Sequence, residues 1–312
     1  MGAGSWGTAF AHVLLERDHD VVLGCHTAEQ ARAIAETGRN PRYLPRVDLA
    51  GVEPVALDAA PGDVDVAVLA VPSTAFAEVV DRLPGEAPVL SLTKGLDPAT
   101  GERLSTLVRG RPVAVLSGPN MAEEIAVGMP TAAVIASEDG YLAGRLQHAI
   151  NSAVFRAYVN QDVAGVELCA AAKNVIALAA GAVDGLELGD NSKAALITRG
   201  LAEMARLGEA AGARPETFAG LAGMGDLIVT CWSRHGRNRR AGELIAQGRS
   251  AGAAVAEIGQ TVEGLTTAPV LQELSRRLNV ELPITEGVCA VLSGQSLPAL
   301  ISRLMGRQPT EE

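Results

Sequence analysis

Aromatic side chains are scarce in this sequence, since only 3% of its 312 residues are Phe, Trp or Tyr. A surface that stacks nucleic-acid bases needs such rings, so the composition argues against one. Hydrophobic residues nevertheless make up 48% of the chain and charged residues 20%, which is typical of a globular protein. The core is therefore expected to consist mainly of Ala, Val, Leu and Ile.

Positive charge is also in short supply. The chain has 26 Lys and Arg residues against 36 Asp and Glu, which gives a formal charge of −10 and a pI near 5.1. The summed field repels nucleic acids and anionic membranes, so neither is an expected partner. An anionic small-molecule substrate would need a local basic pocket.

Patterns for metals, membranes and hydrolysis are missing as well. The four cysteines are far apart, and none forms a CxxC or Cys/His pair with metal-ligand spacing: Cys25, Cys169, Cys231 and Cys289. No uninterrupted apolar run reaches the ~20 residues of a membrane span, and no His/carboxylate dyad supports hydrolase chemistry. We therefore expect reduced thiols, a cytoplasmic location, no metal and no membrane span.

The pattern of expected secondary structure changes near residue 162. Short β-branched runs alternate with helical patterns before it, and Ala/Leu-rich helical patterns at 162–182, 192–211, 240–247 and 267–278 dominate after it. The expected strands are Val21–Leu23, Val64–Val71, Pro88–Leu92, Pro112–Leu116, Thr131–Ala136 and Ala153–Val159. Several are apolar throughout, as in a parallel sheet that is covered on both faces. The sequence thus predicts an α/β domain over 1–162 and an all-α domain over 163–312.

Three glycines open the chain in a GxGxxG pattern: Gly2, Gly4 and Gly7, with Ser5 and Trp6 between the last two. In a Rossmann-like dinucleotide-binding turn, these glycines make the bend, admit the pyrophosphate and let the helix pack on the sheet. A glycine-rich turn without a ligand is the alternative. A strand should precede the motif, but only Met1 does, so the pattern lacks its first strand. A misplaced chain start is our hypothesis, and true truncation is the other possibility.

The cofactor preference is predicted from the residues after the next strand. A site specific for NAD places a carboxylate about 20 residues beyond the glycines, but this stretch reads Leu23-Gly24-Cys25-His26-Thr27. His26, with Arg32 on the next helix, would instead tolerate a 2′-phosphate. The sequence therefore favours NADP or dual use, unless His26 is only a surface loop residue.

Lys173 stands in a helical pattern that is apolar on all sides, in line with Val166, Ala170 and Ala177. A buried ammonium is costly, and its pKa is easily lowered. Such a lysine can donate a proton to a carbonyl oxygen that gains a hydride. The alternative is a lysine whose head reaches water along the helix surface.

Asp226 and Thr230 share one face of a further predicted helix. A functional Asp226 would orient Lys173 or the substrate, whereas the alternative is a simple helix cap.

Polar residues elsewhere also fit an anion site. The run Arg237-Asn238-Arg239-Arg240 puts three guanidinium groups just before a helical pattern, as phosphate binding needs, although a solvated charge run is the alternative. Lys94 and the segment 117–120 each follow an expected parallel strand, at the edge where open α/β sheets bind ligands. Either segment is otherwise an ordinary turn.

Together these segments resemble bacterial NAD(P)-dependent glycerol-3-phosphate dehydrogenase. The resemblance covers nearly the whole chain, and its motifs occur in the family's order: GAGSWGT at 2–8, LTKGLD at 92–97, SGPNMAEEI at 117–125, KNVIALAAG at 173–181, ALITRGLAEM at 195–204, GMGDLIVTC at 223–231, GRNRRAG at 236–242, GQTVEG at 259–264 and LPITEGV at 282–288.

The resemblance implies interconversion of dihydroxyacetone phosphate and sn-glycerol 3-phosphate by hydride transfer with NAD(P)H, which feeds glycerophospholipid synthesis. It implies an active site between the two domains, in a homodimer. Lys173 matches the proton donor and acceptor. The positions that match or adjoin substrate contacts are Lys94, Gly118, Asn120, Asn174, Asp226, Thr230, Gly236, Arg237 and Asn238. Besides the glycines, the positions that match cofactor contacts are Ser5, Trp6, His26, Lys94, Ala122, Arg237, Thr261 and Glu263.

Three departures from the family pattern stand out. The first strand is missing, Asn120 replaces a common Ser or Thr, and Gly236 replaces a Ser that often precedes Arg-Asn. The last two remove hydroxyls and leave the principal charges, so tuning and not loss of activity is expected. The rival functions are a related two-domain NADP-dependent hydroxyacid reductase and a truncated, inactive NADP-binding protein.

Overall fold

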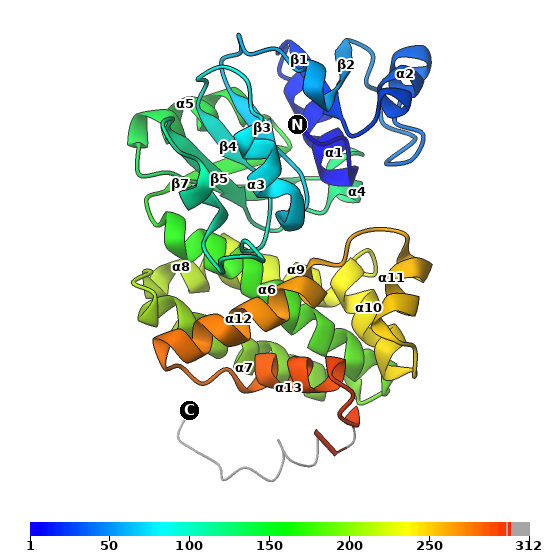
Figure 1. The fold of residues 1–312 in the computed structure, drawn as a ribbon, viewed down its shortest axis with the longest axis vertical. Helices are drawn as coiled ribbons and strands as arrows, with labels where there is room; N and C mark the ends of the chain where they lie inside the picture. The colour runs from blue at the N-terminus through cyan, green and yellow to red at the C-terminus, as the bar shows by residue number, and fades with distance from the viewer. Residues whose placement is uncertain (298, 301–312) are drawn as a thin grey trace.

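The structure is a computed structural model that describes residues 1–297, 299 and 300. Its first half contains all the strands of this described part, and its second half is helical. In Figure 1 the two halves lie one above the other, with α6 (Val163–Gly185) running through the lower half. The predicted boundary falls between β7 (Phe155–Asn160) and α6, although the exact division at 162 and 163 stays a prediction.

The strands form two sheets. β1 (Val21–Cys25) pairs with β2 (Val52–Ala56), and the second sheet has the order β3-β4-β5-β6-β7. Its other strands are β3 (Ala67–Leu69), β4 (Val89–Ser91), β5 (Val113–Ser117) and β6 (Thr131–Ala136). The helices of this half are α1 (Ser5–Leu15), α2 (Ala28–Thr37), α3 (Ser73–Asp81), α4 (Ala122–Ile125) and α5 (Gly140–Ile150).

Two features of the sheets differ from the expectation. β2 is not among the expected strands, because Pro54 lies inside it and proline is unusual in a strand. Pairing is parallel except between β5 and β6, where Leu116 lies opposite Ile135 in an antiparallel register. The prediction of a mainly parallel sheet is thus correct, with this one antiparallel pair.

Residues 1 and 2 lie between the two sheets. The Gly2 amide donates to the Gly24 carbonyl at 2.8 Å, and the Met1 amino group donates to the Val68 carbonyl at 2.8 Å. The Ala70 amide in turn donates to the Met1 carbonyl at 2.9 Å. These two residues therefore connect β1 to β3 at the place of the expected central strand.

The second half contains α6, α7 (Gly189–Ala210), α8 (Pro215–Ala219), α9 (Asp226–Trp232), α10 (Arg237–Ala246), α11 (Ala251–Ile258), α12 (Glu263–Leu278) and α13 (Pro283–Leu292). The four predicted helical patterns correspond, in chain order, to α6, α7, α10 and α12. The last lies wholly inside its helix, and each of the others extends one residue beyond an end of its helix. Residues 298 and 301–312 of the predicted second domain lie outside the described residues.

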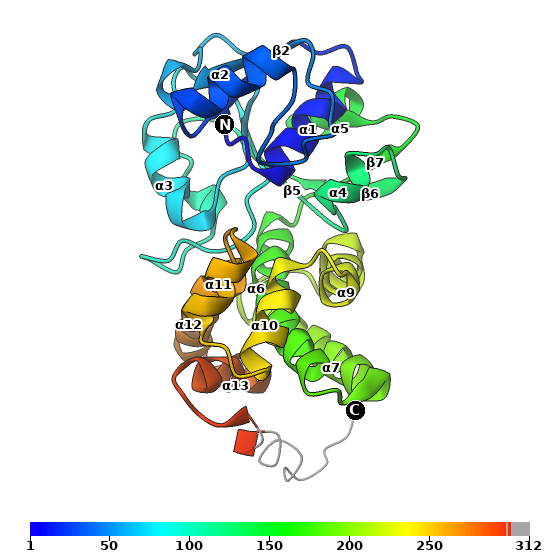
Figure 2. The same ribbon diagram turned by 90° about the vertical axis from the view of Figure 1, so that its right-hand side faces the viewer.

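α6 is the core helix of this half. By length and composition it would suffice to cross a membrane, but 89% of its most apolar window is buried inside the molecule. The helix begins after Asp162, whose carboxylate accepts the Gly165 amide at 2.9 Å. Helices surround α6 in Figure 2, so its apolar faces are covered by protein.

α6 and α10 cross in direct backbone contact. A Cβ atom added to Gly181 would lie 1.8 Å from the Arg239 carbonyl oxygen, and one added to Gly242 would lie 1.9 Å from that of Leu178. Only glycine fits at such a crossing. The contact fixes the helix that carries Lys173 against the helix that begins with Arg237.

Candidate active site

A cleft of about 870 Å³ lies between the sheets and the helices. Residues from both halves of the chain line it, and they include most of the predicted site residues. Those that line it are Gly2, Gly4, Ser5, Trp6, His26, Lys94, Asn120, Ala122, Lys173, Asn174, Thr230, Gly236, Arg237, Asn238, Thr261 and Glu263. Gly7, Gly118 and Asp226 are not among the residues that line the cleft.

The glycine turn has the shape that a pyrophosphate site requires. A Cβ atom added to Gly4 would meet nothing within 4 Å, whereas one on Gly7 would lie 1.8 Å from the Gly2 carbonyl oxygen. Gly4 thus leaves room on the cleft side, and Gly7 allows close packing behind it. Because α1 begins at Ser5, its free N–H groups lie at this turn and can bind phosphate oxygens.

Among the residues that the structure describes, two buried polar atoms of the cleft lack a hydrogen-bond partner: the indole nitrogen of Trp6 and the side-chain oxygen of Asn120. Buried polar atoms are normally paired, so a donor and an acceptor are available here for a ligand. The Asn120 amide nitrogen is already used, since it donates to the Ala132 carbonyl at 3.1 Å. With the open turn at Gly4, these atoms fit a bound dinucleotide.

The cleft also contains a basic residue that was not predicted from the sequence. Arg42 lines the same cleft as His26, whereas the predicted Arg32 is exposed and does not line it. Asn40 anchors the Arg42 loop, because its buried amide nitrogen donates to the Ala3 carbonyl at 2.9 Å and to the Thr8 hydroxyl at 2.8 Å. No periodic pattern marks such a loop, so only the folded chain reveals that Arg42 lines the cleft.

Replacing Arg42 by glutamine should raise the KM for NADPH about tenfold and the KM for NADH much less. A guanidinium beside the cofactor ribose stabilises a 2′-phosphate, and one lost charge-assisted bond corresponds to about tenfold in affinity. Initial rates with each cofactor measure the effect. Arg32→Gln is the matched control and should change neither KM, while equal effects on both cofactors in Arg42→Gln would contradict this role.

Lys173 contacts the carboxylate of Asp226 at the floor of the cleft. Its Nζ donates to Asp226 Oδ1 at 2.6 Å and to the Thr230 hydroxyl at 2.8 Å. Only 5% of Lys173 is exposed, so its head does not reach bulk water along the helix surface. Asp226 does not cap its own helix, since its carboxylate is directed at lysine.

A second lysine approaches the same carboxylate. Lys94 Nζ donates to Asp226 Oδ2 at 2.7 Å and to the Gly118 carbonyl at 3.1 Å. The Ser117 hydroxyl, from the segment 117–120 that was predicted to lie at the ligand-binding edge, donates to Asp226 Oδ2 at 3.3 Å. Two ammonium groups thus share one carboxylate, which leaves a net positive charge in the floor of the cleft, within an acidic protein.

This cluster changes the acidity of its members. Burial lowers the pKa of Lys173 to about 8, with Asp226 opposing the shift and the neighbouring ammonium of Lys94 adding to it. Burial alone would raise the pKa of Asp226, but the two lysines hold it below its ordinary value. Lys173 can therefore exist in both protonation states near neutral pH, while Asp226 stays ionised.

The first turn of α10 places polar side chains next to Lys173. Asn238 donates to the Asn174 side-chain oxygen at 2.9 Å and accepts the Gly264 amide at 2.9 Å. Arg237 is exposed on the cleft wall, where its guanidinium donates to the Gln260 side chain at 3.5 Å. The asparagines link α6, α10 and α12 beneath this guanidinium.

Only one of the three guanidinium groups predicted for the pocket lines the cleft. Arg239 turns away to Asp184 at 2.6 Å, and Arg240 pairs with Glu257 at 3.1 Å. Successive residues of a helix are rotated by about 100°, so the three arginines of α10 cannot share one face. Of the three arginines in the predicted phosphate site, Arg237 alone therefore lines the cleft, and its contact with phosphate stays a prediction.

Glu263 connects the two halves of the molecule. Its carboxylate accepts the Ser73 amide at 3.1 Å and the Ser73 hydroxyl at 2.5 Å, so the starts of α12 and α3 are joined across the cleft. Burial raises the pKa of Glu263, and these hydrogen bonds oppose the rise. Its predicted contact with the cofactor stays a prediction.

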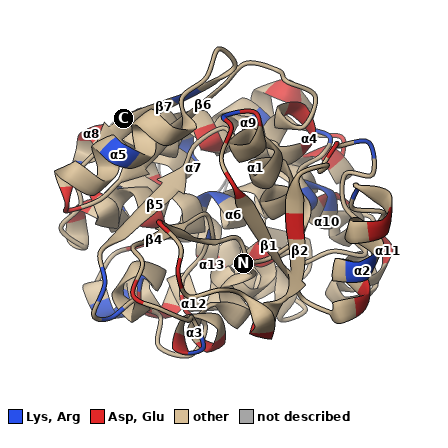
Figure 3. Cartoon of the chain, turned by 90° about the horizontal axis from the view of Figure 1, so that it is seen from above, with Lys and Arg blue, Asp and Glu red and all other residues tan. Residues whose placement is uncertain are grey.

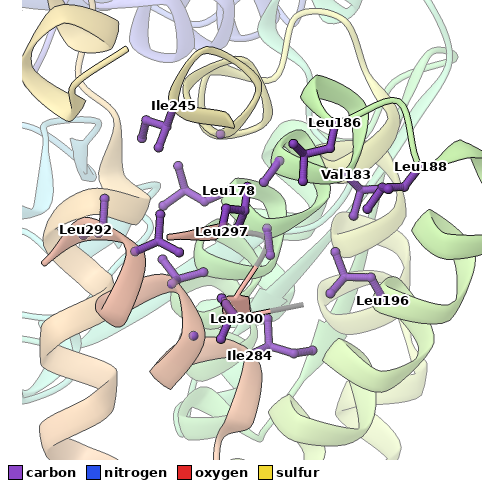
Figure 4. Close-up of a pocket in the computed structure, with 16 residues that line it drawn as sticks. Leu178, Val183, Leu186, Leu188, Leu196, Ile245, Ile284, Leu292, Leu297 and Leu300 are labelled. Carbon is purple, nitrogen blue, oxygen red and sulfur yellow. The ribbon is translucent and has the colours of Figure 1, made fainter. Parts of the chain in front are cut away.

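A second, smaller cavity of about 120 Å³ lies among α6, α7, α10 and α13. Figure 4 shows its lining, which includes Leu178, Leu196, Ile245 and Leu292. No titratable side chain is among the lining residues, so this cavity is unsuited to the chemistry of a carbonyl. In the part of the chain that the structure describes, no group of three or more His, Cys, Asp and Glu is arranged to hold a metal ion.

Comparisons with known proteins agree with this geometry. Residues 1–143 match the model of the NAD-dependent glycerol-3-phosphate dehydrogenase N-terminus, and residues 162–302 match that of the C-terminus. The chain is 46% identical to a glycerol-3-phosphate dehydrogenase [NAD(P)+] of Geobacillus thermodenitrificans, with 100% of this chain and 95% of that protein aligned. A second enzyme of that name, from Halorhodospira halophila, is 44% identical over 100% and 97% of the two chains.

The crystal structure of glycerol-3-phosphate dehydrogenase from Coxiella burnetii superposes with a TM-score of 0.94 at 37% identity, covering 98% of this chain and 97% of that one. A more distant PanE/ApbA family ketopantoate reductase from Ralstonia eutropha, at 17% identity and a TM-score of 0.61, shares the fold alone. The chain therefore belongs to the NAD-dependent glycerol-3-phosphate dehydrogenase family.

Proposed function

We propose that this protein interconverts dihydroxyacetone phosphate and sn-glycerol 3-phosphate with NAD(P)H or NAD(P)+. The observation that carries the proposal is the buried Lys173 ammonium, which Asp226 and Thr230 hold at the floor of a cleft lined by the glycine turn and by Arg237. Membership of the family supports the choice of substrate.

The cofactor would lie along the sheet side of the cleft. The N–H groups at the start of α1 would bind its pyrophosphate, Trp6 would offer its free indole N–H, and His26 with Arg42 would surround the ribose end. When bound, the nicotinamide supplies or accepts the hydride that changes the oxidation state of substrate C2.

The helical side of the cleft would hold the substrate. Arg237 has the fork of donors that suits a phosphate, and Asn238 is fixed beside it by Asn174 and Gly264. Lys94 adds positive charge near the carbonyl oxygen, where negative charge develops as hydride arrives. The predicted roles of Gly236, Thr261 and Ala122 concern residues of the same cleft wall.

Lys173 would move the proton of the reaction. During reduction, its ammonium donates a proton to the oxygen on C2 as that oxygen gains negative charge, and solvent in the cleft later restores the proton. During oxidation, the neutral amine accepts the hydroxyl proton as hydride leaves C2. A pKa of about 8 suits both directions, since a general acid or base works best near the operating pH.

Asp226→Asn should move the alkaline limb of the pH profile for reduction to lower pH. Asp226 raises the pKa of Lys173, so its removal favours the neutral amine, and loss of one close opposite charge corresponds to about one pH unit or more. The pH dependence of kcat/KM for dihydroxyacetone phosphate measures this. Ser117→Ala, which removes one hydrogen bond but leaves the charge, should keep the wild-type limb, and an unmoved limb in Asp226→Asn would refute this coupling.

The activity itself is tested by NADPH and NADH oxidation in the presence of dihydroxyacetone phosphate. Dihydroxyacetone without phosphate and a panel of 2-keto acids serve as competing substrates. We expect turnover with the phosphorylated ketone and little with the others. Preference for a 2-keto acid would support the related reductase, and cofactor binding without turnover of any substrate would support an inactive NADP-binding protein.

The homodimer and the cytoplasmic location stay predictions. Light scattering coupled to size-exclusion chromatography tests the first, and fractionation of cells tests the second.

A further inference from the structure

The chain contains only three lysines, and all of them form ion pairs in its interior or at the cleft. Lys94 and Lys173 belong to the cleft floor. Lys193 lies on α7 and is 6% exposed, outside the lining of the cleft. No role described above accounts for it.

Lys193 is part of a compact ionic cluster with Asp184 and Arg239. Lys193 Nζ donates to both oxygens of Asp184, at 2.9 and 2.8 Å, and Arg239 donates to Asp184 Oδ2 at 2.6 Å. Partial burial alone would raise the pKa of Asp184, but hydrogen bonds from the two cations hold it below its ordinary value. The carboxylate therefore stays ionised at neutral pH and links α6, α7 and α10.

The cluster also holds the end of α9. The Arg239 Nε donates to the Ser233 carbonyl at 3.1 Å, immediately after α9 ends at Trp232. The Lys193 ammonium lies 4.9 Å from the centre of the Trp232 ring, within cation–π distance. α9 carries Asp226 and Thr230, whereas α10 carries Arg237 and Asn238, so the cluster connects the two helices that supply both sides of the substrate site.

The backbone of the turn between α9 and α10 is closely packed at Gly236. A Cβ atom added to Gly236 would lie 2.8 Å from the Thr230 carbonyl oxygen, and the Gly236 amide donates to the Ser233 carbonyl at 3.1 Å. The Ser233 carbonyl thus accepts both this amide and Arg239. A shift of Arg239 would move the turn and, with it, the start of α10.

We propose that Asp184, Lys193 and Arg239 are positioning residues that set the spacing of α9 and α10, and thereby aim Arg237 and Asn238 at the phosphate of the substrate. The inference rests on the proposed function. None of the three residues lines the cleft, so they act through the residues that do.

The test compares Arg239→Gln with Arg240→Gln. Both remove one guanidinium from neighbouring positions of α10, but Arg240 pairs with Glu243 and Glu257 at the surface. We expect Arg239→Gln to raise the KM for dihydroxyacetone phosphate about tenfold or more, since displacements of about 1 Å remote from the chemistry can cost ~100-fold. Its KM for NADPH should change little, and Arg240→Gln should resemble the wild type in both.

Asp184→Asn keeps the shape of the side chain and removes the charge, so it serves where Arg239→Gln fails to fold. It should raise the same KM, and the double variant Asp184→Asn/Arg239→Gln should be no worse than the more impaired single variant, because residues of one network are not additive. Activity is measured well below the unfolding temperature of each variant, so a loss of stability alone would leave the KM unchanged.

An unchanged KM for dihydroxyacetone phosphate in a folded Arg239→Gln or Asp184→Asn enzyme would overturn the proposal, as would strictly multiplicative effects in the double variant. Wild-type protein without dihydroxyacetone phosphate reductase activity would instead overturn the proposed function, so the two failures are distinguishable.

Discussion

Replacing Lys173 by alanine is expected to lower kcat for the reduction of dihydroxyacetone phosphate by at least about 100-fold, and up to about 10,000-fold, which is the usual contribution of a general acid. The chain should still fold, because Asp226 retains the ammonium of Lys94 as a partner at 2.7 Å. Steady-state kinetics measure the loss. Circular dichroism and NADPH binding show whether the variant keeps its structure.

Lys173→Arg separates proton transfer from simple charge. A guanidinium keeps the positive charge but does not release its proton in proteins. If Lys173 acts as an acid and base, the arginine variant should be impaired about as strongly as the alanine variant. Substantial activity in either variant would remove Lys173 from its proposed role.

The second large effect is expected from Arg237→Gln. Loss of a charge-assisted bond to phosphate costs about 1.5–3 kcal/mol, which corresponds to a rise of roughly 10- to 100-fold in the KM for dihydroxyacetone phosphate. Inhibition by inorganic phosphate should weaken in parallel, because it probes the same contact. The predicted contact of Arg237 with the cofactor would add a smaller rise in the KM for NADPH.

Arg234→Gln is the matched control for this variant. Arg234 is exposed in the same turn but does not line the cleft, so its removal lowers the net charge without touching the site. Equal changes in the two variants would indicate a general electrostatic effect and would contradict a specific phosphate contact.

The distribution of charged residues over the whole molecule does not by itself locate the candidate active site. In Figure 3, acidic residues are spread over many of the helices and loops seen from above. The cations that matter are local: Lys94, Lys173 and Arg237 line one cleft in a chain with a formal charge of −10. All three were predicted from the sequence: Lys173 from its apolar helical pattern, Lys94 from its position after a predicted strand, and Arg237 from the run of arginines.

The sequence is informative where a residue conflicts with its pattern. A lysine in an apolar helix and glycines at the start of a helix both indicate function from the residues alone. The pattern could not show that Arg239 and Arg240 leave the cleft, because a run of like residues does not reveal which side of a helix faces the ligand. It could not show the position of Arg42 or the contact of Ser117 with Asp226 either, since both depend on how segments distant in the chain come together.

Contacts between the two halves of the chain also cannot be predicted from sequence patterns. Glu263 is separated from Ser73 by 190 residues and Asp226 from Lys94 by 132, so no local spacing links them. The antiparallel pairing of β5 with β6 likewise depends on the path of the chain and not on the composition of either strand.

The protonation of Lys173 in the free enzyme is the central claim, and it can be measured directly. With only three lysines in the chain, protein labelled with ¹³Cε-lysine gives three side-chain signals, and the one missing in Lys173→Met belongs to Lys173. We predict that this signal titrates with a midpoint near 8. A midpoint near the ordinary lysine pKa of 10.5 would show a solvated amine and contradict the account.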